Sequence, residues 1–212
     1  MDVGQFRLLI GIAAAVCVCA ADTPLEDTLR AVENRYNTAK TLQVLFKEEY
    51  TPPGHARRTE SGIIMLRKPG KMRWNYSQPP GKLFVSDGKM IWLYTPDENT
   101  VERSKFKESE DMRAPLAFLL GKLHFDKEFR NIQAKPEEGG IRITAEPKTD
   151  NLPYSAAEFV VAPDNHIREV RVTGFDRSVL RFIFDQERLN PNLDAKLFTF
   201  QVPNGAKVVE AQ

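Results

Sequence analysis

The chain has 212 residues, and its 30 Lys and Arg residues nearly balance 29 Asp and Glu, for a formal net charge of +1. A net charge this small gives the chain as a whole no electrostatic attraction to nucleic acid or to strongly acidic partners. Without its first 21 residues the chain has a comfortable length for a single domain.

The first 21 residues have the layout of a secretory signal peptide. Arg7 precedes an apolar stretch from Leu8 to Val18, and small residues follow as far as Ala21. Because this stretch is too short to span a bilayer, we expect cleavage after residue 20 or 21. The mature protein is then a single domain of residues 22–212 in the periplasm. An uncleaved membrane anchor is the alternative.

No motif in the sequence indicates catalysis or metal binding, and nothing singles out a pair among its many carboxylates. Cys17 and Cys19 lie inside the signal segment, so the mature domain has no thiol and no disulfide. Lipidation at Cys17 or Cys19 is a further alternative for this segment. His55, His124 and His166 are widely separated and lack the spacing of a metal site. GxSxG, P-loop and GxGxxG motifs are also missing. We therefore expect neither an enzyme nor a cofactor nor a bound metal.

The mature domain is predicted to open with an amphipathic helix. Thr23-Pro24-Leu25-Glu26 fits a capping box with proline at the first helical position. Apolar residues then recur at spacings of three and four, at Leu25, Leu29, Val32, Tyr36 and Ala39. We expect this stripe to cover a sheet.

The stretch from Gly62 to Tyr94 predicts four short strands joined by turns. In one of them Met72, Trp74 and Tyr76 alternate with polar residues, so one face is aromatic. The residues Met90–Tyr94 are apolar on both faces and need cover on both sides. So much aromatic surface is the first indication of a site for an apolar ligand.

Further strands are predicted at Val44–Tyr50, Thr100–Phe106, Asp126–Ala134, Ile141–Glu146, Glu158–Val161, Ile167–Gly174, Val179–Gln186 and Leu197–Val202. A short helix is expected within Asp111–Gly121 and a helical turn at Asn192–Lys196. The pattern predicts a mainly β (α+β) fold of about ten to eleven antiparallel strands. We expect one large curved sheet, an unclosed half-barrel with helices covering its concave face. Such a shell either fills with side chains or keeps a ligand cavity.

Several segments resemble one known family in order and spacing. They are Leu66-Arg67-Lys68-Pro69-Gly70-Lys71-Met72-Arg73-Trp74, Val85-Ser86-Asp87-Gly88-Lys89, Trp92-Leu93-Tyr94, Pro115-Leu116-Ala117-Phe118-Leu119-Leu120 and Phe198-Thr199-Phe200 with Pro203 and Gly205. Together they resemble the outer-membrane lipoprotein carrier protein family (LolA) over essentially the whole mature chain. The family's fold is an unclosed antiparallel half-barrel with helices as a lid.

The resemblance implies a monomeric periplasmic chaperone for acylated lipoproteins. It would receive them from an inner-membrane ABC-type release complex and pass them to an outer-membrane acceptor, where one is present. Shielding is needed because each exposed methylene costs about 0.8 kcal/mol in water. A related half-barrel protein that binds or senses another lipid or glycolipid is the alternative, and an envelope protein with a filled shell is a third reading.

Residue positions carried over from the family give candidate lipid-binding residues. Ile64, Leu66, Met72 and Trp74 are expected to face the cavity from the sheet, and Leu116 and Leu119 from the lid, the segment Pro115–Leu120. Aromatic residues on strands are also ordinary core. For Phe46, Leu83, Val85, Trp92, Phe182 and Phe184, core packing is at least as good an interpretation.

One position departs from the family. The family has a lid-latching Arg immediately before the motif proline, where this chain has Lys68 before Pro69. Lysine offers a mobile ammonium rather than a planar fork of donors. Arg67 is the alternative latch, although neighbouring strand residues face opposite sides of a sheet.

Overall fold

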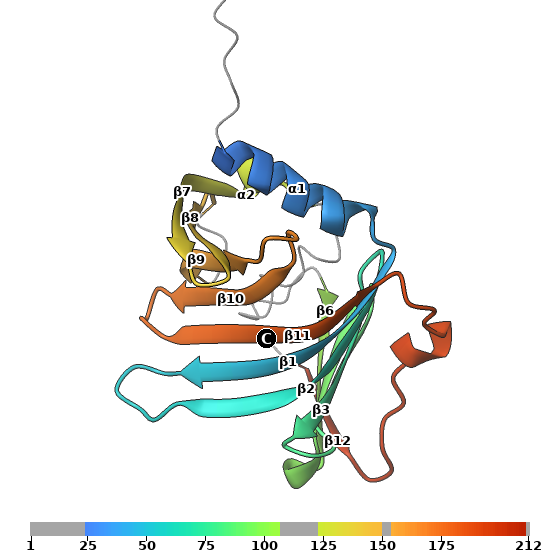
Figure 1. Ribbon diagram of the computed structural model, residues 1–212. Coiled ribbons are helices and arrows are strands. Elements are labelled where there is room, and N and C mark those ends of the chain that lie inside the picture. Colours follow the sequence, from blue (N-terminus) through green and yellow to red (C-terminus); the bar gives the residue numbers. More distant parts are fainter. Residues whose placement is uncertain (1–23, 107–122, 150–153, 211–212) are drawn as a thin grey trace, which may run out of the picture.

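The computed structural model describes residues 24–106, 123–149 and 154–210. Figure 1 shows their arrangement, a strongly curved sheet with few helices. The elements are α1 (Pro24–Thr38), β1 (Thr41–Thr51), β2 (Arg58–Arg67), β3 (Lys71–Gln78), β4 (Leu83–Asp87), β5 (Met90–Thr95), η1 (Pro96–Glu98), β6 (Thr100–Lys105), α2 (Phe125–Glu128), β7 (Phe129–Glu137), β8 (Gly140–Pro147), β9 (Tyr154–Val161), β10 (Ile167–Gly174), β11 (Val179–Leu189), η4 (Ala195–Phe198) and β12 (Lys207–Glu210). Among the described residues no helix is long and apolar enough to cross a membrane.

All twelve strands belong to one sheet. Its order is β12-β6-β5-β4-β3-β2-β1-β11-β10-β9-β8-β7, so the first six strands and the next five each follow chain order. The two series meet where β1 pairs antiparallel with β11 at the middle of the sheet. The edges at β7 and β12 do not pair with each other, which confirms the predicted unclosed half-barrel.

Two predicted strands are wrong in detail. The segment predicted at Asp126–Ala134 begins with the helical turn α2, and strand β7 starts only at Phe129. The segment predicted at Leu197–Val202 holds the end of η4 and no strand, and the last strand is β12, which pairs parallel with β6. The described residues therefore form twelve strands rather than ten or eleven. The predicted short helix within Asp111–Gly121 lies outside the described residues.

The first helix follows its predicted stripe. Val32 and Tyr36 are buried in the main apolar cluster, and Leu25 and Leu29 pack partly buried against it. Ala39, the last residue of the stripe, is buried just after the helix ends. Figure 1 shows α1 lying across one side of the curved sheet. Because Val32 and Tyr36 share a cluster with strand residues, α1 covers part of the concave face.

The convex face over β2 to β5 is covered by residues 190–206. Phe198 is buried with Leu193 and Met65 in a second apolar cluster, and Trp92 of β5 stacks on Phe200 with ring centroids 5.8 Å apart. This packing explains why the alternating Phe198-Thr199-Phe200 looks like a strand in sequence. Its aromatic rings pack against the outer side of the sheet, and its described backbone does not pair with a strand.

The convex face over β1 and β8 to β11 carries a network of ion pairs instead. Arg181 bridges Glu49 (3.2 Å) and Glu169 (2.6 Å), and Arg142 lies 3.5 Å from Glu169 and 3.0 Å from Glu158. Glu49 and Glu169 are buried. A buried carboxylate needs such partners, because an uncompensated buried charge is strongly destabilising.

Candidate functional site

The candidate site is the apolar concave face of the sheet. Ile64, Leu66, Met72 and Trp74 all lie on it, each no more than 5% exposed and all in the main apolar cluster. The register explains their common direction, since Ile64 lies opposite Trp74 and Leu66 opposite Met72 across β2 and β3. Directly opposed residues of antiparallel strands point to the same face.

Trp74 is the centre of an aromatic group on this face. Its ring centroid lies 5.2 Å from that of Phe46, 5.6 Å from Phe84 and 5.6 Å from Phe182. These neighbours come from β1, β4 and β11, so the group spans the middle of the sheet. Phe46 and Phe182, which sequence left open between core and ligand wall, therefore share one surface with Trp74.

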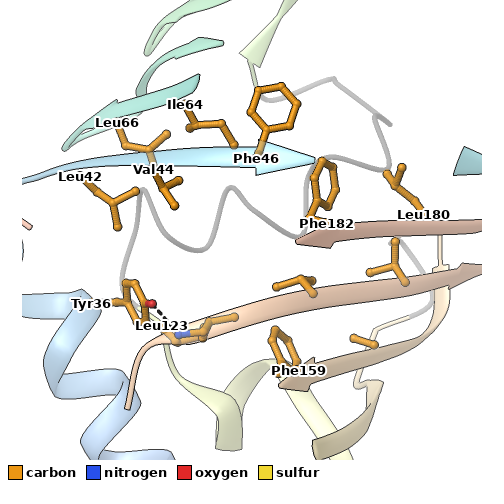
Figure 2. Close-up of a cluster of buried hydrophobic side chains, with 14 of the residues drawn as sticks. Tyr36, Leu42, Val44, Phe46, Ile64, Leu66, Leu123, Phe159, Leu180 and Phe182 are labelled. Carbon is orange, nitrogen blue, oxygen red and sulfur yellow. Dashed lines mark hydrogen bonds between the residues drawn. The ribbon is translucent and has the colours of Figure 1, made fainter. Parts of the chain in front are cut away.

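The apolar surface continues over the strands of the second series. Phe159 of β9 packs edge-on against Phe125 and Phe129, with centroids 5.3 Å and 5.6 Å away. Figure 2 shows Phe159, Phe182, Phe46 and Leu123 facing a common interior from different elements. Sequence reasoning named neither Phe159 nor Phe125, because each stands in a short segment without a distinctive motif.

The lid is the remaining part of the predicted site. Leu116, Leu119 and the whole of Pro115–Leu120 lie outside the described residues. The cavity between the lid and the sheet therefore stays a prediction, and so do the lipid-binding roles of the six residues.

Lys68 lies in the turn between β2 and β3, against the C-terminal end of α1. Its ammonium donates hydrogen bonds to the carbonyl oxygens of Tyr36 and Asn37, the latter at 3.4 Å. A cation suits this place, because the last carbonyls of a helix carry partial negative charge. Burial lowers the pKa of the Lys68 ammonium below its ordinary value.

Arg67 points the other way. Its guanidinium donates to the carbonyl of Leu193 at 3.1 Å, in the segment that covers the convex face. Only Lys68 of the two contacts a helix on the concave side, as the alternation of strand residues requires.

A carboxylate of β11 fixes α1 to the sheet. The hydroxyl of Tyr36 donates to Glu187 at 2.6 Å and accepts from the backbone N–H of Ile167 at 2.8 Å. Arg35 donates to the other oxygen of Glu187, at 2.7 Å through Nη2. Burial, together with the charge of Glu187, raises the pKa of the Tyr36 phenol, so it stays a protonated donor.

A second set of contacts ties α1 to the chain that follows residue 122. The amide of Asn37 donates to the carbonyl of Leu123 at 2.8 Å and accepts from its N–H at 2.6 Å. One turn earlier, Glu33 accepts from the N–H of Phe125 at 2.7 Å. The same helix end therefore contacts Lys68 and the segment after the lid.

One group of side chains has the composition of a metal site. Single ligand atoms of Glu33, His124 and Asp126 lie within 4.8 Å of one another. Sequence spacing did not show this group, because Glu33 comes from a distant element. Glu33 already accepts a backbone hydrogen bond and Asp126 is exposed, so the arrangement is also that of an ordinary helix contact.

These features define a class of protein. It is an unclosed half-barrel with a continuous apolar concave face and a helix held over that face by polar contacts at its end.

Comparison with known proteins identifies the family. The family model of the outer membrane lipoprotein carrier protein LolA matches residues 37–201, so the chain belongs to this family. The outer-membrane lipoprotein carrier protein of Azotobacter vinelandii is 30% identical over 97% of this chain and 98% of its own length. That of Chromobacterium violaceum is 28% identical over 93% and 94%. A carrier family is not a family of enzymes, which confirms the expectation from sequence.

A solved structure supports the fold alone. An uncharacterized conserved protein from Thermus thermophilus superposes with a TM-score of 0.52 at 14% identity, over 89% of this chain and all of its own.

Proposed function

We propose that this protein is a periplasmic carrier that shields the acyl chains of lipoproteins against its concave face. The observation that carries the proposal is the continuous apolar surface from β4 across to β9, with Trp74 of β3 in its first half and Phe159 of β9 at its far end. An acyl chain of about sixteen carbons gains on the order of 12 kcal/mol when it leaves water, at about 0.8 kcal/mol per methylene. A surface of this chemistry suits that cargo.

Access to this surface requires the cover to move. Val32 and Tyr36 of α1 and Leu123 pack in the same cluster as the strand residues. Displacement of α1 exposes apolar side chains, which the acyl chains then cover. Binding is therefore linked to opening: acyl chains that bind the open state better than the closed state shift the equilibrium toward the open state.

Lys68 acts as the latch of this cycle. Its bonds to the carbonyls of Tyr36 and Asn37 stabilise the closed state without touching the apolar surface. Closure then competes with the cargo and favours release. Arg67, which holds the convex segment through Leu193, has a structural role.

The proposed route begins at an inner-membrane ABC-type release complex and ends at an outer-membrane acceptor. The protein acts as a monomer, and its signal segment, residues 1–21, is removed. The alternative cargo is another lipid or a glycolipid, since an apolar face recognises acyl chains whatever their headgroup.

The two tryptophans of the chain allow a direct test. Trp74 is 1% exposed on the concave face, whereas Trp92 stacks on Phe200 on the convex side. In a Trp92→Phe variant, an acylated peptide should change the emission of Trp74, and the same peptide without its acyl chain should not. A Trp74→Phe variant, which keeps Trp92, is the matched control and should show little change.

Native mass spectrometry of protein purified from the periplasm identifies the cargo. Acylated lipoprotein supports the proposal, and a free lipid or glycolipid supports the alternative. A Trp74 signal that stays constant while another method shows the acylated peptide bound would reject the concave face as the site.

A further inference from the structure

A cleft at the end of the half-barrel concentrates positive charge. Its volume is about 840 Å³, and it lies between the last residues of α1, the turn after β2 and the start of the convex segment. The lining residues are Asn37, Thr38, Ala39, Lys40, Thr41, Arg67, Lys68, Asn190, Pro191, Asn192 and Leu193. Three of them are cations and none is acidic.

The cations of this cleft differ from Arg142 and Arg181, which belong to the ion-pair network on the convex face. Arg142 and Arg181 each contact carboxylates of neighbouring strands. Arg67 and Lys68 instead donate to backbone carbonyls, and Lys40 is exposed. Gathering like charges without an acidic partner in the described part of the chain is unfavourable for the empty protein, and it creates a positive potential focused by the cleft walls.

From this geometry we infer that the cleft binds an acidic segment of a partner protein, with a carboxylate placed between Lys40, Arg67 and Lys68. The volume exceeds that of a free small anion. The walls carry amides and hydroxyls, such as Asn192 and Thr41, which suit a peptide rather than an acyl chain. A singly charged carboxylate is favoured over a phosphate dianion, because the carbonyls of Tyr36 and Asn37 at the helix end repel additional negative charge.

This site is coupled to the latch. The ammonium of Lys68 contacts the carbonyls of Tyr36 and Asn37 and also lines the cleft. A carboxylate in the cleft competes with those carbonyls for the ammonium, and a charged acceptor forms the stronger bond. Docking of the partner therefore weakens the hold on α1. This coupling rests on the proposed function, whereas binding of the acidic segment does not.

Binding is tested with a fluorescent hexaglutamate peptide at low ionic strength, by anisotropy. Arg67→Gln and Lys40→Gln should each weaken its binding about tenfold, as expected for loss of one charged contact. Arg73→Gln is the matched control. Arg73 also donates to a carbonyl of the convex segment, that of Leu197 at 3.0 Å, but it lines a separate, smaller cleft. Its substitution should leave the affinity unchanged.

Two results would overturn the inference. One is equal loss of affinity in Arg73→Gln and Arg67→Gln, which would show that the peptide only follows net charge. The other is complete displacement of the peptide by an equal concentration of inorganic phosphate, which would assign the cleft to phosphate.

The coupling has its own readout. Hexaglutamate at a concentration that saturates the unmodified protein should slow its release of a bound acylated peptide, because the weakened latch no longer favours closure, and should slow release from Arg67→Gln much less. If the acylated peptide binds and hexaglutamate does not, the cleft inference fails while the carrier function stands. If hexaglutamate binds in the cleft and no acylated peptide binds, the carrier function fails instead. Hexaglutamate bound without any effect on release would overturn the coupling.

Discussion

Replacing Tyr36 by Phe should destabilise the protein through its hydroxyl alone. The ring can keep its place in the apolar cluster, so the change removes only two hydrogen bonds, one to Glu187 at 2.6 Å and one from the N–H of Ile167 at 2.8 Å. A hydrogen bond to a charged group contributes about 1.5–3 kcal/mol, and a buried N–H left without a partner costs about 1–3 kcal/mol. Since such terms are not additive, we expect a loss of about 3 kcal/mol.

The assay is urea unfolding followed by circular dichroism, with hydrogen exchange of the Ile167 amide as a local probe. For a chain of this size the loss corresponds to a fall in melting temperature of roughly 6–12 °C. Tyr94→Phe is the matched control, because the hydroxyl of Tyr94 donates to Asn99 at 3.2 Å at a partly exposed site. Its loss should stay below about 1 kcal/mol. A Tyr36→Phe variant no less stable than Tyr94→Phe would refute the assigned role of the hydroxyl.

Three further predictions concern the latch, the ion-pair network and the sheet. Lys68→Leu should accept lipoprotein but deliver it to outer-membrane vesicles at least tenfold more slowly, because a shielded charged hydrogen bond contributes about 1.5–3 kcal/mol. Lys68→Arg is the control and should deliver normally. Delivery at the wild-type rate by Lys68→Leu would show that the latch lies elsewhere. Burial by itself raises the pKa of Glu169, but the hydrogen bond and charge of Arg181 outweigh it and hold that pKa below its ordinary value. The resulting stabilisation is present above the unfolded pKa of about 4.3 and is lost as the pH falls through the folded pKa. Glu169→Gln should therefore reduce the acid-induced drop in unfolding free energy, and an unchanged pH profile would count against the ion pair. Gly62→Ala should lower the free energy of unfolding in urea by about 1–3 kcal/mol or more, because the added Cβ would lie 2.1 Å from the carbonyl oxygen of Asn75. An unchanged urea midpoint would show that β3 can move aside.

Alternation along strands is the part of the fold that sequence predicts best. Met72 and Trp74 have polar neighbours, so a period of two alone places them on one face, and the register with Ile64 confirms it. The same rule misleads at Phe198, where alternating aromatics pack on the outside of the sheet without forming a strand. Alternation indicates that a segment has an apolar and a polar face. It does not tell whether the segment joins a sheet as a strand or packs on the outside of one.

Contacts between distant elements are the part that sequence could not give. The position of Lys68 before a proline indicates a candidate latch only through family resemblance. Its acceptors, the carbonyls of Tyr36 and Asn37, follow from where the end of α1 lies. Likewise nothing in the sequence near Glu187 points to Tyr36, which lies 151 residues away. Such pairs depend on the curvature of the whole sheet, which no local pattern encodes.

The central pairing of β1 with β11 has a consequence for the order of folding. The strands β2 to β6 and β7 to β10 each pair with a sequence neighbour, so each series can form from short loops. The seam between the series joins residues as far apart as Leu42 and Leu189. A chain that emerges from its N-terminus can build the first series early but cannot join the two until β11 is made. Until then the aromatic surface around Trp74 lacks Phe182, so a newly made chain leaves this surface incompletely covered until nearly its full length has emerged.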